Sequence, residues 1–433
     1  MKVICLLVMI GFFLLVNAFS SVAQEDNDMK GMIEIIKLFR ALDDEMSSPN
    51  YLEPLLISDT ILSNTRGTNF EETALTIISN LYSWVGEYQK SLELYSKTFE
   101  VAALTDNQPI DLNGFIAVDA VQEIIELAGQ YDVIFINDVG HRPEKSVFVT
   151  MLLEDLMNQG YTKIVFDEID STKGMINLSK IPTENLSLKA LAPNYANLVR
   201  TSLSLGYEIV LYPYISITNY RNRDSIFALE IFDQQNIDMA KMIVFYNKDI
   251  INASEKTLAY WLELLTGKAV LNIDQIKYSE EHDQIFESPF YQKAVELNKS
   301  KLPFILKNKD DYFQDDTNEG FDFYVFHPRT SYTSGRASWE TDYVLGNKKY
   351  LINLPKEIYQ NIPEGALIQV FYKQEFDSGI PIDQILYKGY EDTNKPIVVP
   401  EGRFILRVEG MERSNLLQFE FTYDLENGLA ILK

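Results

Sequence analysis

The fold is decided by residues 131–168, which read YDVIFINDVGHRPEKSVFVTMLLEDLMNQGYTKIVFDE. The stretch begins with a run rich in Val, Ile and Phe and closes with a second apolar run, which is typical of strands buried on both faces of a parallel sheet. Between the two runs, apolar residues recur every four positions at Phe148, Leu152 and Leu156. That spacing predicts an amphipathic helix, so the whole stretch predicts a strand–helix–strand unit.

Polar residues follow both strands of this unit. Asn137, Asp138 and His141 come after the first strand, and Asp167 and Glu168 come after the second. Ligands of open parallel sheets bind outside the carboxyl ends of the strands. We therefore expect these five side chains to converge at one edge of the sheet and to form a functional site.

The pattern extends on both sides of this unit. Runs typical of strands, each separated from the next by enough residues for a crossover helix, begin at Asp132, Lys163, Glu208, Lys241 and Lys268. This order predicts an α/β domain over residues 113–308 with a mainly parallel sheet. Residues 322–433 instead contain short β-rich runs separated by turn residues, beginning with 323–326, and predict a β-sandwich-like domain. The acidic residues 309–321 between them are expected to form a linker, since their spacing fits no EF-hand calcium loop.

Residues 24–112 are helical in pattern. Within them, 86–95 resemble the turn and second helix of a tetratricopeptide (TPR) unit, but one such unit is visible and a repeat array needs at least about three. We expect a helical cap packed on the sheet domain rather than a peptide-binding solenoid.

The first 23 residues have the composition of a secretory signal peptide. Lys2 precedes an apolar core at 4–16, and small residues at 21–23 form a cleavage site. A bilayer span needs about 20 apolar residues, so an uncleaved anchor is the weaker alternative and no later stretch qualifies. The sequence thus predicts a periplasmic or extracellular protein without a span after cleavage.

Composition narrows the chemistry. The chain has 433 residues, of which 46% are hydrophobic, so two or three globular domains are expected. Its one cysteine, Cys5, lies in the signal core, so the exported chain has no disulfide, thiolate nucleophile or zinc–thiolate site. A formal charge of −25 disfavours nucleic acid and anionic lipid as partners. The acidity serves either solubility or a preference for cationic ligands.

Several motifs resemble the erythromycin esterase-like superfamily, which is related to the haem-binding-uptake and Tiki-like fold group. In that family the first strand usually ends in an acid followed three residues later by His, as at Asp138 and His141, and the second strand ends in Glu, as at Glu168. Similar stretches occur at 197–200, 223–224, 265–267, 273–275, 326–329 and 380–384, the last two being like exported bacterial relatives.

The resemblance implies an exported hydrolase of a small-molecule ester or amide. Its catalytic residues would be His141, Asp138, Asp167 and Glu168. Its substrate-binding residues would be Asn137, Arg223 and Asp224. A small-molecule ligand is the implied partner, and a protein partner for the C-terminal β domain is a further expectation.

The chain also departs from the family pattern. Asp stands where Glu is usual, which withdraws the carboxylate by about 1.5 Å, and a misplacement of about 1 Å can cost about 100-fold in rate. The family's second histidine, expected after the strand at 242–246, is replaced by Asn247 and Lys248. The alternative function is therefore a catalytically degenerate binding protein, a pseudoenzyme that keeps the fold and the pocket.

If the site is active, His141 would take a proton from water or a hydroxyl while Asp138 or Asp167 orients its imidazole. Clustered acids would raise the pKa of His141, and Arg223 would stabilise an oxyanion. The other histidines, His282 and His327, are expected to be exposed and structural, respectively.

Other catalytic motifs do not occur. The sequence contains no GxSxG elbow, Gly-rich phosphate loop or HExxH motif. No cofactor is predicted, but a divalent metal bound by Asp138, His141, Asp167 and Glu168 has suitable ligand types and stays open.

Overall fold

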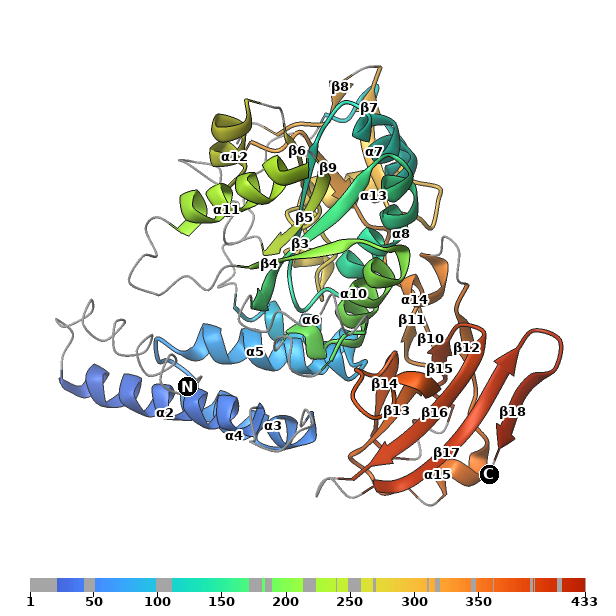
Figure 1. The fold of residues 1–433 in the computed structure, drawn as a ribbon. Helices are drawn as coiled ribbons and strands as arrows, with labels where there is room; N and C mark the ends of the chain where they lie inside the picture. Colours follow the sequence, from blue (N-terminus) through green and yellow to red (C-terminus); the bar gives the residue numbers. More distant parts are fainter. Residues whose placement is uncertain are drawn as a thin grey trace.

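The computed structural model is a mixed α/β protein with N-terminal helices, a mainly parallel central sheet and C-terminal antiparallel sheets (Figure 1). It describes residues 22–42, 51–98, 111–170, 181–183, 189–212, 223–238, 240–247, 258–267, 270–309, 311–315, 320–343, 348–360, 362–389, 392, 394–410 and 415–432. The expected signal peptide falls outside these residues except for its last two positions. Within the described parts, no helix combines the length and apolar character that crossing a bilayer requires.

The central sheet has the strand order β1-β7-β9-β6-β2-β5-β3-β4, and β8 pairs with β7. Its strands are β1 (Ile116–Asp119), β2 (Val133–Asp138), β3 (Tyr161–Asp170), β4 (Glu208–Tyr212), β5 (Lys241–Asn247), β6 (Val270–Asp274), β7 (Phe304–Asn308), β8 (Asp311–Tyr312) and β9 (Phe323–Phe326). The strands from β9 to β4 pair in parallel, whereas β1, β7 and β8 form an antiparallel edge. The prediction of a mainly parallel sheet is confirmed.

The first four residues of strand β2, 133–136, are apolar because the strand is covered on both faces. Ile134 and Ile136 pack into one hydrophobic core, and Val133 and Phe135 pack into another. The strand thus needs no polar face, and its polar residues come only at its carboxyl end.

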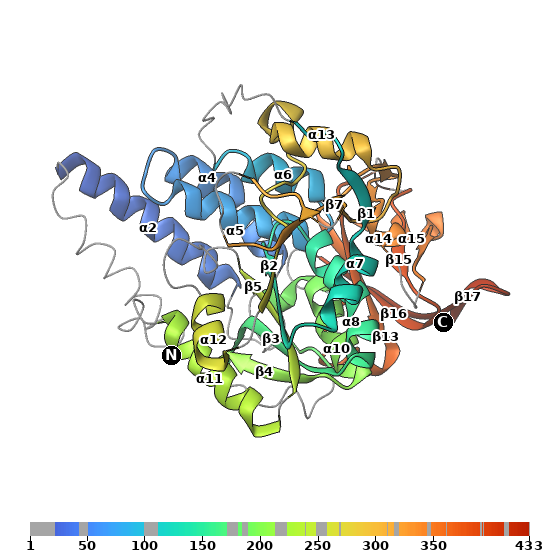
Figure 2. The same cartoon turned by 90° about the horizontal axis from the view of Figure 1, so that it is seen from above.

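Helices cover both faces of the sheet. The crossover and flanking helices are α7 (Ala120–Ala128), α8 (Glu144–Asn158), η2 (Lys189–Leu191), α10 (Pro193–Leu205), α11 (Arg223–Asp238), α12 (Leu258–Thr266), η5 (Gln284–Phe286) and α13 (Pro289–Leu297). Figure 2 shows α11 and α12 on one side of the strands and α7, α8 and α10 on the other. The predicted stripe of Phe148, Leu152 and Leu156 on α8 is fully buried. Gly160 follows that helix with a φ of 90°, a conformation that glycine adopts without strain.

Two structural details differ from the sequence-based expectation. The run Phe323–Phe326 was expected in the C-terminal domain, but it forms β9 of the central sheet, where all four residues are buried. The backbone and carboxylate of Asp322 fix it there through hydrogen bonds to the backbone of Asn272. Within the expected linker, β8 pairs with β7, and Asp315 accepts a 2.5 Å hydrogen bond from the hydroxyl of Tyr278. The described part of this segment is therefore attached to the α/β domain.

The N-terminal helices cover the carboxyl end of β2. They are α2 (Val22–Leu42), α3 (Leu52–Leu56), α4 (Ser58–Thr65), α5 (Glu71–Trp84) and α6 (Tyr88–Tyr95). Figure 1 shows α5 and α6 beneath the strands. The side chain of Asn80 on α5 lies against Gly140, and the hydroxyl of Ser91 on α6 donates to the backbone carbonyl of His141 at 3.3 Å.

The C-terminal region consists of antiparallel sheets. Five strands pair in the order β14-β13-β16-β17-β18, β12 pairs with β15, and β10 pairs with β11. Their bounds, with those of the short helices, are β10 (Tyr332–Thr333), β11 (Arg336–Ala337), α14 (Trp339–Asp342), β12 (Tyr350–Ile352), α15 (Lys356–Tyr359), β13 (Ala366–Tyr372), η6 (Lys373–Glu375), β14 (Asp383–Tyr387), β15 (Ile397–Val399), β16 (Gly402–Glu409), β17 (Asn415–Asp424) and β18 (Gly428–Leu432).

A polar junction fastens the C-terminal sheets to α10 and α5. The guanidinium of Arg200 donates to the carbonyl of Ile380 at 2.8 Å, and the amide of Asn197 donates to the carbonyl of Ile382 at 2.8 Å. The side chain of Gln384 donates to the last carbonyl of α5 at 2.9 Å. Two of the stretches quoted above, 197–200 and 380–384, thus contact each other at the junction.

Candidate functional site

A buried polar cluster lies at the carboxyl ends of β2 and β6. Asn137 at the end of β2 connects this strand to β6, because its side-chain NH2 donates a hydrogen bond to Asp274 Oδ1 at 2.8 Å. Its side-chain oxygen accepts from the backbone N–H of Gln275 at 2.8 Å, and its backbone carbonyl accepts from the side chain of Gln275 at 2.7 Å. All three residues are buried. The amide expected to bind substrate therefore connects two strands.

Asp138 forms an ion pair with a lysine that the sequence pattern did not single out. Lys189 Nζ, in η2, lies 2.7 Å from Asp138 Oδ2, and both side chains are buried. The ammonium group also lies 5.0 Å from the centre of the Tyr195 ring, within the range of a cation–π interaction. The charge of Asp138 is thus balanced by a cation from a segment about fifty residues away.

His141 is buried beneath α6. Its side chain is stacked on Tyr95, with 3.4 Å between ring centres and 19° between ring planes. Among the described residues, neither ring nitrogen has a hydrogen-bond partner. The hydrogen bond expected from His141 to Asp138 is therefore not formed.

The pKa of His141 lies well below its usual value, chiefly because burial disfavours the imidazolium and further because Arg142 and Lys145 are cationic. The prediction that neighbouring acids raise this pKa is wrong. The physical reason is that the ring is desolvated and that the cations following it in sequence dominate its surroundings. His141 is neutral at neutral pH.

Lys145 is fully buried in the first turn of α8. Its ammonium donates to the hydroxyl of Ser279 at 3.0 Å and lies 3.8 Å from the carboxylate of Glu144. Burial is the main reason that its pKa falls to about 8. Sequence reasoning missed this residue. A cation at a helix N-terminus opposes the helix dipole, so its position was the available indication that Lys145 has a special role.

His327, which follows β9, joins the cluster. Its Nε2 lies 3.2 Å from the side-chain oxygen of Gln275, and its Nδ1 lies 3.3 Å from the hydroxyl of Tyr343. Burial, followed by the nearby Lys145 and Arg142, places its pKa well below the usual value. Hydrogen bonds on both ring nitrogens give His327 the structural role expected of it.

The remaining predicted site residues are described only in part. Asp167 and Glu168 lie in β3 and Arg223 begins α11, but their side chains fall outside the described residues. Asp224 is half-buried in the first turn of α11. Within the side chains that the structure describes, no group of three or more His, Cys, Asp or Glu could hold a metal ion. The proposed metal site includes Asp167 and Glu168 and so extends beyond this description.

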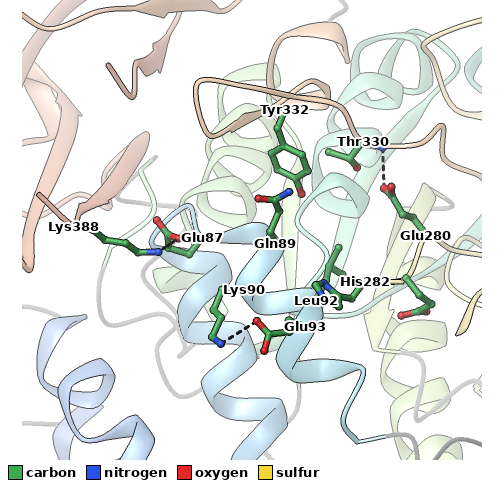
Figure 3. A pocket seen from close by; sticks show the side chains of 11 residues that line it. Glu87, Gln89, Lys90, Leu92, Glu93, Glu280, His282, Thr330, Tyr332 and Lys388 are labelled. Atoms are coloured by element: carbon green, nitrogen blue, oxygen red, sulfur yellow. Dashed lines mark hydrogen bonds and ion pairs between the residues drawn. The ribbon is translucent and has the colours of Figure 1, made fainter. Parts of the chain in front are cut away.

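A cavity of about 480 Å³ lies beside the cluster (Figure 3). It is lined by Glu87, Gln89, Lys90, Leu92, Glu93, Glu280, Glu281, His282, Thr330, Tyr332 and Lys388. Arg142 connects it to the cluster, since its guanidinium donates to the carbonyl of Glu280 and lies 2.7 Å from Glu281 Oε1. His282, on the cavity wall, is exposed as expected.

Comparison with known proteins gives little further information. No protein family matches the chain, and no curated protein matches it. One solved structure is similar at 10% identity and a TM-score of 0.29: the C-terminal region of Pasteurella multocida toxin, which is described as having a thiol-protease-like catalytic triad. The match covers 92% of this chain and 61% of that one, so the chain spans about three fifths of the toxin structure. A TM-score of this size does not establish a common fold.

Proposed function

We propose that this chain is an exported, catalytically degenerate member of the erythromycin esterase-like group that binds a small molecule without hydrolysing it. One observation carries the proposal: Asp138, one of the two acids expected to orient the catalytic base, is paired with a lysine instead. Asp138 lies 2.7 Å from the ammonium of Lys189, and among the described residues His141 has no hydrogen-bond partner.

A general base needs a fixed orientation and a pKa near the working pH. His141 is held by stacking on Tyr95, and no described carboxylate hydrogen-bonds to its ring. Its lowered pKa makes it a weak base. Turning Asp138 toward the imidazole would leave Lys189 buried without this partner, which typically costs several kcal/mol. The internal ion pair therefore favours binding over proton transfer.

Hydrolysis of a small ester or amide is the second candidate function. The neutral imidazole of His141 can accept a proton, and its ring nitrogens make no hydrogen bonds to the described residues. The buried ammonium of Lys145 could stabilise a developing oxyanion. This candidate requires α6 to expose the ring to water.

Hydrolysis of a panel of small esters and amides separates the two functions. The purified protein and His141→Ala would be assayed side by side, with and without added divalent metal ions. We expect no turnover from either protein while circular dichroism shows both to be folded. Turnover by the wild type that His141→Ala abolishes would overturn the binding proposal and identify His141 as the base.

Three further proposals concern the N-terminal helices, the C-terminal sheets and the signal peptide. We propose that α5 and α6 form a single TPR-like pair, because the hydroxyl of Ser79 on α5 donates to the carbonyl of Ser91 on α6 at 2.7 Å. We propose that the C-terminal sheets form a sandwich, since Ile352 of β12 and Leu406 of β16 share one hydrophobic core. The protein partner of this region stays a prediction. N-terminal sequencing of the exported protein tests the signal peptide, with Gln24 as the expected first residue.

A further inference from the structure

The cavity beside the cluster is built by four segments that are distant in sequence. Helix α6 supplies one wall, and the loop after β6, with Glu280 and His282, supplies the opposite one (Figure 3). Thr330 and Tyr332 come from the segment that reaches β10, and Lys388 comes from the end of β14. Its volume of about 480 Å³ lies within the range of about 300 to 1,000 Å³ for small-molecule sites.

The charges on the α6 wall are balanced internally. Glu93 lies 3.0 Å from the ammonium of Lys90, and Glu87 is paired with Lys388 (Figure 3). The two lysines of the lining are therefore already engaged by carboxylates. An anionic ligand would have to displace these partners, so the cavity does not favour one.

The opposite wall carries negative charge that is less well balanced. Glu280 accepts a 2.8 Å hydrogen bond from the backbone N–H of Thr330, and no described lysine or arginine forms an ion pair with its carboxylate. Glu281 is paired with Arg142 through Oε1, but its Oε2 is buried and has no hydrogen-bond partner among the described residues. Burial raises the pKa of both glutamates, as expected of carboxylates that a further cation would stabilise.

Apolar and aromatic side chains complete the lining. Leu92 offers aliphatic contact, and the ring of Tyr332 extends toward Gln89 across the cavity (Figure 3). An aromatic ring beside a carboxylate is a favourable setting for an organic cation, because the ring face attracts positive charge. The charge of −25 on the whole chain also attracts cations from a distance.

We propose that this cavity binds the ammonium or guanidinium group of a small organic cation, with Glu280 as its counter-ion, Glu281 as a second acceptor and the ring of Tyr332 beside the positive charge. The proposal concerns recognition, and it holds whether or not the cluster around His141 is catalytic. Absence of hydrolysis therefore does not affect it, and absence of cation binding leaves the conclusion about hydrolysis unchanged.

Isothermal titration calorimetry of the full exported protein at pH 7.5 and 0.15 M salt tests the proposal. Agmatine, which carries an ammonium and a guanidinium group, is the first probe, followed by butylammonium, neutral butanol and anionic butyrate. We expect one site per chain for the two cations and no binding of the other two probes.

Glu280→Gln keeps the acceptor for Thr330 but removes the charge. We expect it to weaken agmatine binding by about tenfold or more, the usual loss for a hydrogen bond to a charged group. The matched control is Glu426→Gln, which removes one charge from the exposed β17–β18 turn and should bind as the wild type does. If Glu280→Gln does not fold, Tyr332→Leu replaces it, with a several-fold loss expected from the missing ring.

Three results would overturn the proposal. The first is no binding of either cation at millimolar concentration. The second is equal affinity for butanol and butylammonium. The third is evidence of general attraction to an acidic surface: either Glu280→Gln and Glu426→Gln weaken agmatine binding equally, or agmatine binds at several weak sites per chain.

Discussion

Replacing Arg336 by methionine should loosen the junction between the C-terminal sheets and the rest of the protein. Arg336 is fully buried, and its guanidinium pairs with the carboxylates of Glu340 and Asp383. Glu340 also accepts a hydrogen bond from the hydroxyl of Tyr88 on α6 at 3.1 Å. One arginine thus balances two buried acids at the point where three parts of the fold meet.

The magnitude follows from what the substitution leaves behind. Methionine fills most of the space but removes the cation, and a buried ion pair that loses one partner typically costs about 3 to 5 kcal/mol. Both acids keep donors, because Glu340 accepts from the backbone of Ala337 at 3.0 Å and Asp383 accepts from the backbone of Val398 at 2.7 Å. We therefore expect a loss of stability at the lower end of this range, about 3 kcal/mol at pH 7.5, which lowers the midpoint of urea unfolding by about 1 M.

Tryptophan fluorescence can follow this unfolding, because two of the three tryptophans lie at the junction. Trp339 packs against Tyr88 with 4.9 Å between ring centres, and the carbonyl of Trp84 accepts from Gln384. The loss should also depend on pH. Burial raises the pKa of Glu340 even beside Arg336, and removal of the cation raises it further.

The sign of the pH effect is fixed by proton binding. Between the unfolded pKa of glutamate, about 4.3, and the raised folded value, the folded variant binds more protons than the unfolded chain. Its stability relative to the wild type therefore falls as pH rises through this window, so the loss should be smaller at pH 5 than at pH 8. The control Lys373→Met breaks an exposed pair with Glu420 and should cost less than about 1 kcal/mol. A loss for Arg336→Met that matches this control, or one that is the same at pH 5 and pH 8, would refute the reasoning.

Three further predictions concern the buried cluster. Lys189→Met should lower the free energy of unfolding by about 3 kcal/mol because it removes a buried cation that is paired with Asp138. Adding Asp138→Asn should recover most of the loss in urea titrations, and additive losses would contradict this. The wild type should lose stability as pH falls below about 6.5, because His141 then binds a proton in the unfolded chain but not in the folded protein. Thermal melts should show a smaller loss between pH 7 and pH 5 for His141→Gln, and equal losses for the two proteins would contradict this prediction. The pKa of Lys145 is lowered to about 8, so between pH 8 and about pH 10.4 the unfolded chain binds more protons than the folded protein. The stability of the wild type relative to Lys145→Met should therefore rise over this pH range, and a constant difference would show that the lysine titrates normally.

The sequence predicted the central sheet well because burial leaves a direct mark on it. A strand segment covered on both faces must be apolar, and residues 133–136 of β2 and 242–246 of β5 are. The stripe on α8 likewise follows from the helical period. Strand β9 was misplaced because four apolar residues alone do not tell which sheet they join, and that choice depends on Asp322 binding Asn272.

The chemistry of the site was less predictable, since it depends on which charges meet. Sequence placed acids at the ends of β2 and β3, but the cation that pairs with Asp138 comes from η2. The cations that help to lower the pKa of His141 follow it in the sequence, but the burial that is the main cause and the stacking on Tyr95 depend on a helix far away in the chain.

Some of the stretches that resemble the erythromycin esterase-like family lie at a contact between domains rather than in the candidate site. Stretches 197–200 and 380–384 contact each other at the junction, where Arg200 and Asn197 bind backbone carbonyls. Such contacts stabilise the arrangement of domains whether or not a protein catalyses anything. Resemblance in these stretches therefore supports shared architecture more than shared activity.

The distribution of unbalanced charge finally favours recognition over catalysis. At the carboxyl edge of the sheet, Asp138 is paired with a buried lysine, and among the described residues no carboxylate hydrogen-bonds to the ring of His141. In the cavity, by contrast, Glu280 lacks an ion-pair partner among the described residues and Glu281 is only half engaged. Arg142 contacts both glutamates and follows His141 directly in the chain. A cation bound in the cavity would therefore compete with Arg142 for Glu281 without any proton transfer.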